Sequence, residues 1–211
     1  MNLSIFVKRY FLISLFAAIG LVLIANLIEW ERVIRFDSSI ITFITEFHSE
    51  LMTKVMIAIT TFGNTESVVI ISLLALFLLY RLGNNKLEMA IVFLVVGASG
   101  AVNYLIKNLV QRIRPDQNPL IIEHGFSFPS GHSMSAFALY GVLAFMVWLK
   151  VENKWLRAAL ISACAGLVLL IGTSRIYLGV HYPSDVIGGF LGGASLIGLA
   201  VWFYQQKRTE A

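Results

Sequence analysis

Long uninterrupted apolar stretches dominate this chain of 211 residues. A helix that spans a bilayer needs about 20 consecutive, mainly apolar residues. Six stretches approach or reach this length, at residues 10–28, 67–80, 87–106, 133–149, 155–172 and 184–204. They are continuous rather than alternating in polarity, and they exceed the ~10 residues of a membrane β-strand. We therefore expect an all-α integral membrane bundle of six transmembrane helices.

The composition agrees with a membrane protein built as one unit. Apolar residues make up 58% of the chain and charged residues 13%, whereas a soluble domain carries about 25% charged residues. Six spans would use about 120 residues, and the remainder is too short for a second domain of ~100 residues or more. We expect residues 1–211 to form a single transmembrane domain. Cys164 is the only cysteine, so it makes no internal disulfide and we expect it to pack in the bundle.

The first two apolar stretches differ from a standard span. The stretch 10–28 follows Lys8 and Arg9 like a signal peptide, but it is longer than the usual ~7–15 residues and no cleavage site follows it, so we expect a retained span. The stretch 67–80 covers only about 21 Å as a helix. We expect that helix to extend through Asn64 and Glu66 inside the bundle.

Between the first two spans, residues 37–64 form an amphipathic segment. Its apolar residues recur at helical spacing, at Ile40, Ile44, Phe47, Leu51, Val55 and Ile59. The pattern predicts an extra helical segment that lies at the membrane interface, with Asp37 or Ser38 as its N-cap. A helix packed against the bundle fits the same pattern equally well.

The lysines and arginines orient the chain. They occur in ones and twos between apolar stretches, so no basic face for nucleic acid forms. With a cytoplasmic N-terminus, nine of the sixteen lie inside, and four lie outside once three site candidates are set aside, as the positive-inside rule requires. The four tryptophans, Trp30, Trp148, Trp155 and Trp202, fall at span ends, where such rings prefer to sit. We expect both termini to be cytoplasmic.

Three polar clusters lie on the predicted outer side, at 107–115, 129–132 and 174–185. Charges near membrane depth are costly and usually functional. In the first cluster, Lys107 and Arg114 are seven residues apart, so on a helix they share a face about 10.5 Å apart and can converge on one anion. Pro115 cannot continue that helix. Alternatively, both cations snorkel to the interface.

The second cluster reads Pro-Ser-Gly-His. Pro129 suits a first helical turn, which would leave the backbone N–H groups of Ser130 and Gly131 unpaired and available to a phosphate. His132 at its edge can protonate a leaving oxygen. Alone, the sequence is equally well an ordinary helix start with an interfacial histidine.

In the third cluster, His181 and Asp185 are four residues apart. A carboxylate that holds one imidazole nitrogen as N–H leaves the other nitrogen free as an electron-pair donor. Alternatively, Asp185 only stabilises the first turn of a helix. Arg175 supplies a third fixed cation, which needs an anion. The residues alone do not decide which histidine attacks.

Together the clusters suit phosphoryl transfer, in which catalysis is mostly positioning and stabilisation of negative charge. The nearby carboxylates Asp116, Glu123 and Asp185 lack the paired spacing of a magnesium or calcium site, and no zinc motif occurs. We expect no metal and no other cofactor.

The pattern K-x6-RP, PSGH and SR-x5-H-x3-D resembles that of the type 2 phosphatidic acid phosphatase superfamily. All eleven fixed positions between Lys107 and Asp185 match in order. The small size and short loops are similar to bacterial lipid phosphatases of the phosphatidylglycerophosphatase B type, rather than to the soluble haloperoxidases of the superfamily. The resemblance implies a bacterial inner-membrane protein with its site on the extracytoplasmic side.

The resemblance also implies roles. His181 would be the nucleophile that forms a phosphohistidine, Asp185 its orienting partner, and His132 the acid for the leaving lipid alcohol. The phosphoryl oxygens would be bound by Lys107, Arg114, Ser130, Gly131 and Arg175. No metal is implied.

The expected substrate is a lipid phosphate in the bilayer, with phosphatidylglycerol phosphate first and undecaprenyl pyrophosphate second. The connection 116–128 borders the site and should help to discriminate between them. A phosphate-lipid transporter or binding protein, with the same cations and no nucleophile, is the alternative from another class. The oligomeric state is left open.

Other polar and small residues receive structural predictions. We expect His48 and His124 to be exposed, and Ser99 and Asn103 to form hydrogen bonds within the bundle. Two overlapping G-x3-G pairs, made by Gly188, Gly189, Gly192 and Gly193, favour close packing against another helix of the same chain over dimerisation.

Overall fold

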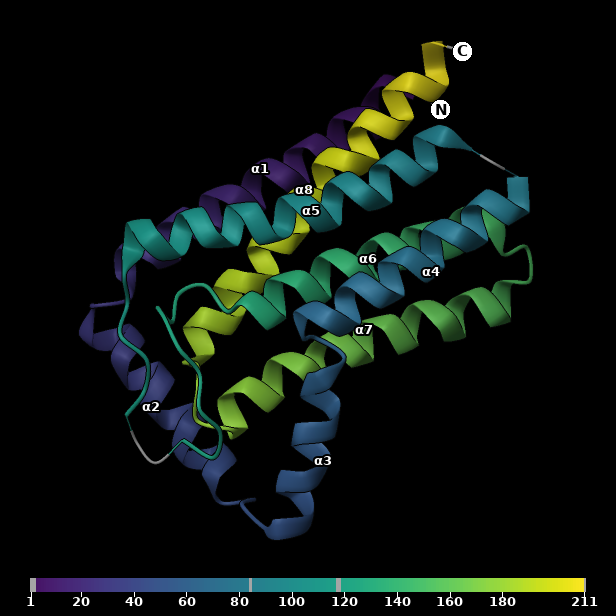
Figure 1. Ribbon diagram of the computed structural model, residues 1–211. Coiled ribbons are helices and arrows are strands. Elements are labelled where there is room, and N and C mark those ends of the chain that lie inside the picture. The colour runs from purple at the N-terminus through teal and green to yellow at the C-terminus, as the bar shows by residue number, and fades with distance from the viewer. Residues whose placement is uncertain (1–2, 84, 117–118, 211) are drawn as a thin grey trace.

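The computed structural model describes residues 3–83, 85–116 and 119–210, and all of the regular secondary structure in these residues is α-helical (Figure 1). Its eight helices there are α1 (Leu3–Leu27), α2 (Glu31–Thr45), α3 (Glu50–Thr61), α4 (Thr65–Gly83), α5 (Lys86–Val110), α6 (Gly131–Lys150), α7 (Lys154–Tyr177) and α8 (Pro183–Glu210). The all-α prediction is confirmed.

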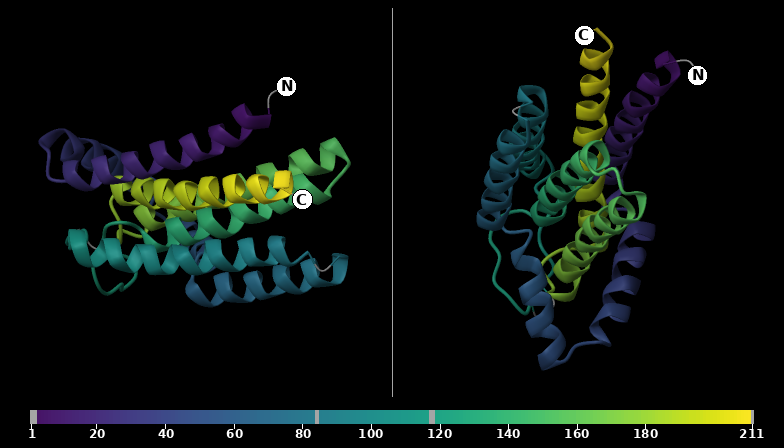
Figure 2. Two further views of the ribbon diagram at one scale, coloured as in Figure 1. Left: turned by 90° about the horizontal axis from the view of Figure 1, so that it is seen from above. Right: turned by 90° about the vertical axis from the view of Figure 1, so that its right-hand side faces the viewer.

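Six of these helices, α1 and α4 to α8, are long and apolar enough to cross a membrane. This confirms the six predicted spans. Both chain ends lie at one end of the bundle, and α2 and α3 lie at the other (Figures 1 and 2). The extension expected for the second span is partly wrong: α4 begins at Thr65. Asn64 lies in the turn before it, and Glu66 is exposed rather than inside the bundle.

The segment 37–64 is not one helix but parts of two. Helix α2 begins at Glu31, so Asp37 is a buried residue inside it and neither Asp37 nor Ser38 is its cap. The chain turns after Thr45, and Ser49 caps α3 by accepting a hydrogen bond from the backbone N–H of Met52 (3.2 Å). Helix α2 contacts α7 and α8, and α3 contacts α7. The alternative prediction, packing against the bundle, is confirmed.

Helix α6 is central and contacts α4, α5, α7 and α8. Small residues let α8 approach it closely: a Cβ added to Gly189 would lie 2.7 Å from the carbonyl oxygen of Ser130, and one added to Gly193 would lie 2.7 Å from the Cβ of Phe137. The glycines therefore serve packing within the chain, as predicted. Helix α1 lies along the outer side of α8, where the Ser14 hydroxyl donates to the Ser195 carbonyl (2.7 Å).

This packing brings four helix ends together. The C-terminal ends of α5 and α7 and the N-terminal ends of α6 and α8 meet at the end of the bundle that α2 and α3 cover (Figure 1). The long connection 111–130, from α5 to α6, crosses the same end. All three polar clusters of the sequence therefore lie at this end of the bundle.

Candidate active site

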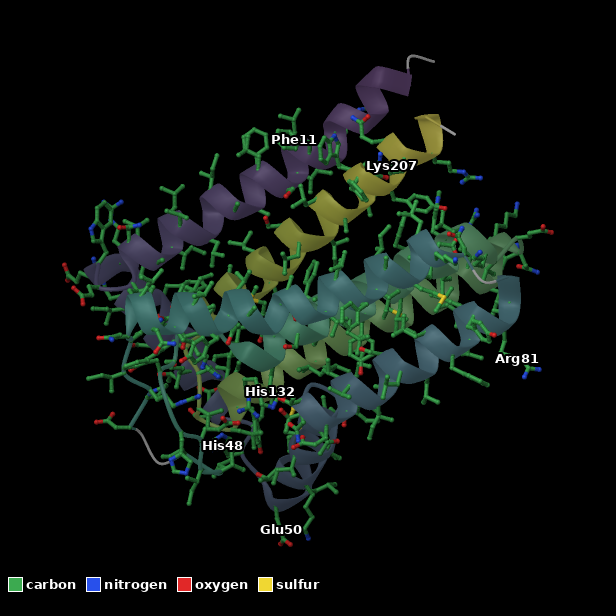
Figure 3. The ribbon with its side chains drawn as sticks, turned by 45° about the horizontal axis from the view of Figure 1, so that its top comes forward. Phe11, His48, Glu50, Arg81, His132 and Lys207 are labelled. Atoms are coloured by element: carbon green, nitrogen blue, oxygen red, sulfur yellow. The ribbon has the colours of Figure 1, made fainter. Side chains whose placement is uncertain are left out.

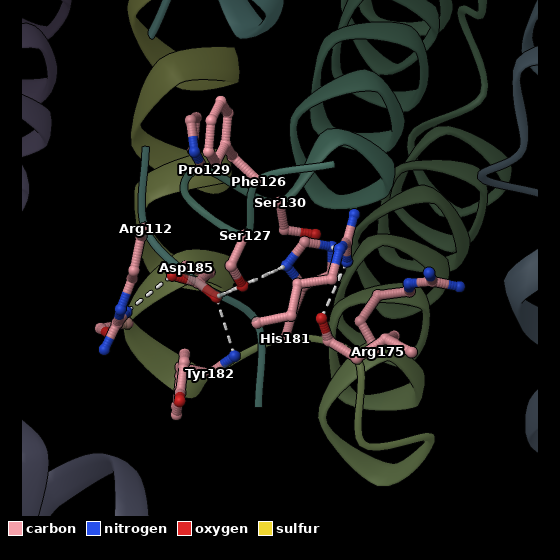
Figure 4. A network of polar contacts seen from close by, with 12 residues as sticks. Arg112, Phe126, Ser127, Pro129, Ser130, Arg175, His181, Tyr182 and Asp185 are labelled. Atoms are coloured by element: carbon pink, nitrogen blue, oxygen red, sulfur yellow. Dashed lines mark hydrogen bonds and ion pairs between the residues drawn. The ribbon is translucent and has the colours of Figure 1, made fainter. Parts of the chain in front are cut away.

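The predicted site residues all belong to this end of the molecule. Figure 3 shows His132 on the side of His48 and Glu50, far from Phe11 and Lys207 at the end that holds the termini. Figure 4 shows His181, Asp185, Ser130 and Arg175 around one network of polar contacts.

His181 lies in the turn between α7 and α8, and only 1% of its surface is exposed. Its Nε2 is 3.1 Å from a terminal nitrogen of Arg114. A guanidinium has donors only, so Nε2 must present its electron pair there. The hydrogen is then on Nδ1, which is 3.3 Å from the Ser127 hydroxyl and 3.5 Å from Asp185 Oδ2 (Figure 4). Burial lowers the pKa of His181 to about 4, although Asp185 opposes this shift, so the ring is neutral at pH 7.

Asp185 is completely buried in the first turn of α8 and accepts several hydrogen bonds. Its Oδ2 accepts from the Ser127 hydroxyl (2.5 Å) and from the Tyr182 N–H (2.9 Å), and its Oδ1 accepts from Arg112 (2.6 Å). Ser127 thus joins the carboxylate to His181 Nδ1. Because it lies outside the three clusters and resembles any other serine in sequence, sequence analysis missed it.

The carboxylate of Glu123 joins Arg114 and Arg175. Sequence analysis considered Glu123 only as a metal ligand. Glu123 pairs with a terminal nitrogen of Arg175 and lies 3.6 Å from Arg114. Arg175 is 1% exposed and also donates to the Thr60 hydroxyl (2.8 Å). Burial alone would raise the pKa of Glu123, but Arg175, His132 and Arg114 together hold it below its usual value. Glu123 is therefore an anion in contact with two of the three predicted phosphate-binding cations.

Lys107 and the start of α6 complete the basic side of the site. Lys107 Nζ donates to the Phe126 carbonyl (2.6 Å), and its charge interacts with Arg114, Glu123 and Arg175. The prediction that the N–H group of Ser130 is free is wrong, because that N–H donates to the backbone carbonyl of Asp185 (3.0 Å). Ser130 instead caps α6.

Gly131 lies close to α5. A Cβ there would be 3.2 Å from Asn103 Oδ1, and the Asn103 amide donates to the Pro129 carbonyl (3.1 Å). The predicted hydrogen bond of Asn103 within the bundle is confirmed. It links α5 to the residues that precede α6. Within residues 3–83, 85–116 and 119–210, the N–H of Gly131 has no acceptor, so one backbone donor of this helix start remains free for an anion.

His132 forms a hydrogen bond with Asn64, a residue outside the three polar clusters. Its Nε2 is 2.7 Å from Asn64 Oδ1, and because an amide oxygen only accepts, Nε2 carries a hydrogen there. Asn64 was expected inside a span and not in the site, since nothing in the sequence links it to His132. His48 and His124 are exposed, as predicted.

The site is suited to an anion. Three cations, a free helix amide and two histidines surround it, and among the described residues no cluster of three or more His, Cys, Asp or Glu side chains could hold a metal ion. The connection 116–128 lines it with Glu123, Phe126 and Ser127, while 117–118 lie outside the described residues.

Comparison with known proteins agrees with this arrangement. A family model described as the PAP2 superfamily matches residues 88–209. Phosphatidylglycerophosphatase B of Bacillus subtilis (strain 168) is 40% identical over 114 residues, which cover 54% of this chain and 56% of that protein. A putative undecaprenyl-diphosphatase of Escherichia coli (strain K12) is 27% identical over 147 residues, 65% of this chain and 68% of that protein.

A solved structure is similar over nearly the whole chain. The crystal structure of a transmembrane PAP2 type phosphatidylglycerolphosphate phosphatase from Bacillus subtilis aligns with a TM-score of 0.81 and 31% identity, covering 92% of this chain and 96% of that one. By contrast, the sequence match to the Bacillus subtilis phosphatidylglycerophosphatase B spans little more than half of that relative's length.

Proposed function

The chain belongs to the PAP2 superfamily, and from this membership and the geometry of its site we propose that it is a membrane lipid phosphatase that works through a phosphohistidine. It removes a terminal phosphate from a lipid phosphate. One observation carries the proposal: His181 is buried and neutral, with Nδ1 directed to Ser127 and Asp185 and with the Nε2 electron pair facing Arg114.

In the first step, the phosphoryl group lies among Lys107, Arg114 and Arg175, with the N–H of Gly131 as a further donor and Ser130 fixing the helix start. His181 Nε2 attacks the phosphorus, and the bond from phosphorus to the lipid oxygen breaks. Asp185, through Ser127, stabilises the positive charge that develops on the imidazole. The cations stabilise the equatorial oxygens as their charge grows.

The leaving oxygen takes a proton from His132, which releases the dephosphorylated lipid. In the second step a water molecule attacks the phosphohistidine, and the now neutral His132 accepts a proton from that water. The bond from phosphorus to His181 Nε2 breaks and inorganic phosphate departs. His132 is charged again, ready for the next substrate. No step needs a metal or another cofactor.

We assign phosphatidylglycerol phosphate as the first substrate to test, because the most similar relatives described above carry that activity in their names. Undecaprenyl pyrophosphate is the second, supported by the Escherichia coli relative. Both present a terminal phosphoryl group on a lipid whose chains stay in the bilayer. The proposed location is the bacterial inner membrane, with the site on the extracytoplasmic side and both termini cytoplasmic.

The test replaces the proposed nucleophile. His181→Ala should reduce phosphate release from both lipids by more than about 1,000-fold, since no other group can form the covalent intermediate. In the wild-type protein, acid-labile phosphate should be trapped on His181 after rapid quenching with labelled substrate, and release should persist in a chelator. Exposed His124→Ala is the matched control and should keep wild-type rates.

The same experiment separates hydrolysis from transport. A phosphate-lipid transporter or binding protein would release no inorganic phosphate, even as the wild-type protein. In that case His181→Ala would leave lipid binding intact. Full phosphate release by His181→Ala would rule out the phosphohistidine mechanism.

A further inference from the structure

Asp37 is a buried carboxylate in α2, 51 residues before the region that the family model matches. Only 2% of its surface is exposed. Its Oδ1 accepts from the backbone N–H of Ser184 (2.8 Å), and its Oδ2 accepts from the Ser184 hydroxyl (2.6 Å) and from Arg112 (2.9 Å). A charge this buried is tolerated only when it is paired, so these partners define its place.

Arg112 links this carboxylate to the catalytic one. One terminal nitrogen bonds Asp37 and the other bonds Asp185 (2.6 Å). The guanidinium also stacks on the ring of Tyr182, with 4.0 Å from its central carbon to the ring centre (Figure 4). A guanidinium is planar and its donors are fixed in direction, so an anchor on one nitrogen determines where the other nitrogen points.

We infer that Asp37 is a positioning residue of the active site: through Arg112 and Ser184 it fixes the carboxylate of Asp185, and thereby the ring of His181. The contacts form a continuous chain from α2 to the catalytic turn, and Ser184 adjoins Asp185 in sequence. The hydrogen-bond partners of Asp37 described above, Arg112 and Ser184, are not predicted phosphate ligands. The inference rests on the proposed role of His181 as nucleophile.

A positioning role differs from simple attachment of α2 to the bundle. If Asp37 only attaches α2, its loss lowers the folded fraction but leaves each folded molecule fully active. If it positions Asp185, its loss slows the attack by His181 in every folded molecule. Substrate binding should change little in that case, because the cations around the phosphoryl group keep their places.

The experiment follows the first turnover by rapid quenching, on full-length protein in detergent, with a saturating excess of phosphatidylglycerol phosphate labelled in its terminal phosphate, and KM is measured separately at steady state. Asp37→Asn should slow formation of the trapped phosphohistidine by roughly 10-fold, as small displacements of reacting groups do, while KM stays within about 2-fold of wild type. The matched control is Glu31→Gln, a charge removed from the exposed surface of the same helix. It should leave both quantities unchanged.

The rate constant does not depend on how much of the sample is folded, because misfolded molecules reduce only the amplitude of the reaction. A normal rate constant with a reduced amplitude would show that Asp37 merely attaches α2, and would overturn the inference. Absence of any phosphohistidine in the wild-type protein would instead contradict the proposed function, so the two failures are distinguishable.

A double-mutant cycle tests whether Asp37 acts through Arg112. Arg112→Met should slow the reaction more than Asp37→Asn does, because it removes a direct partner of Asp185. In the Asp37→Asn, Arg112→Met double variant the loss of rate should be smaller than the product of the two single losses, because part of the effect of Asp37 passes through Arg112 and the rest through Ser184. Effects that multiply in the double variant would mean that Asp37 does not act through Arg112.

Discussion

At the residue scale, the Glu123 carboxylate would compete with the phosphoryl group of a substrate for Arg114 and Arg175. The carboxylate contacts Arg175 and lies 3.6 Å from Arg114, the two guanidinium groups that the phosphoryl group of a substrate would need. A carboxylate and a phosphoryl group make the same kind of charge-assisted hydrogen bonds to arginine. Binding of a lipid phosphate therefore requires Glu123 to give up at least part of these contacts.

Glu123→Gln should strengthen anion binding. Removing the negative charge frees both guanidinium groups, and we expect the inhibition constant of inorganic phosphate to fall roughly 5-fold, which corresponds to the ~1 kcal/mol of one partly exposed ion pair. The measurement is competitive inhibition of lipid hydrolysis at low ionic strength. Glu46→Gln, at the exposed C-cap residue that follows α2, should have no effect. Weaker phosphate binding in Glu123→Gln would show that Glu123 holds the arginines in place.

The charged residues of this site and its proposed nucleophile are easier to find in the sequence than the residues that support them. Lys107, Arg114, Arg175 and His181 stand out because a charge or an imidazole is rare in an apolar chain. Their supports do not stand out, since a serine, an asparagine or an acid near a span end has many ordinary roles. Ser127, Asn64 and Asp37 acquire a role only through partners 54, 68 and 75 residues away, respectively.

At the element scale, the contact between α6 and α8 sets the distance between the proposed phosphate-binding helix start and the proposed catalytic carboxylate of Asp185. Gly189 lies one turn after Asp185 on α8 and faces the carbonyl oxygen of Ser130 and the Cβ of Ser133 at the start of α6. In the same place, the Ser130 N–H donates to the Asp185 carbonyl. A change in this contact must therefore move the two halves of the site relative to each other.

Gly189→Ala should damage stability and activity together. Its Cβ would lie 2.7 Å from the Ser130 carbonyl oxygen, too close without a shift of one backbone, and such overpacking costs about 1–3 kcal/mol. We expect a lower melting temperature in detergent and a lower kcat. The control is Gly166→Ala in α7, where a Cβ meets nothing within 4 Å. Unchanged melting and turnover in Gly189→Ala would contradict the importance of this contact.

The apolar stretches predict long helices reliably, because few other structures satisfy the backbone of a membrane segment. The break between α2 and α3 was harder to predict. The apolar spacing of residues 37–64 runs through it without interruption, and the break depends on the Ser49 cap and on Tyr177, whose ring packs edge-on against His48 and whose hydroxyl accepts from the Ser49 N–H. These contacts come from α7, which no local pattern reveals.

At the scale of the whole molecule, the six long helices place the site and the chain termini at opposite ends of the bundle (Figures 1 and 2). An even number of crossings returns the chain to the side on which it starts. The lysines and arginines of the sequence favour the terminal end as cytoplasmic. If that orientation is correct, Glu50 at the start of α3 faces the outside of the cell, and Glu152 in the turn between α6 and α7 faces the cytoplasm.

Cysteine labelling in intact cells tests this orientation. In a Cys164→Ala background, Glu50→Cys should react with a membrane-impermeant maleimide without permeabilisation, because its position is exposed at the end of the bundle that holds the site. Glu152→Cys, which is also exposed and lies at the other end, should react only after the membrane is opened. The two variants control each other, since both thiols label once cells are lysed. The reversed pattern would place the site in the cytoplasm, where a substrate confined to the outer leaflet could not reach His181.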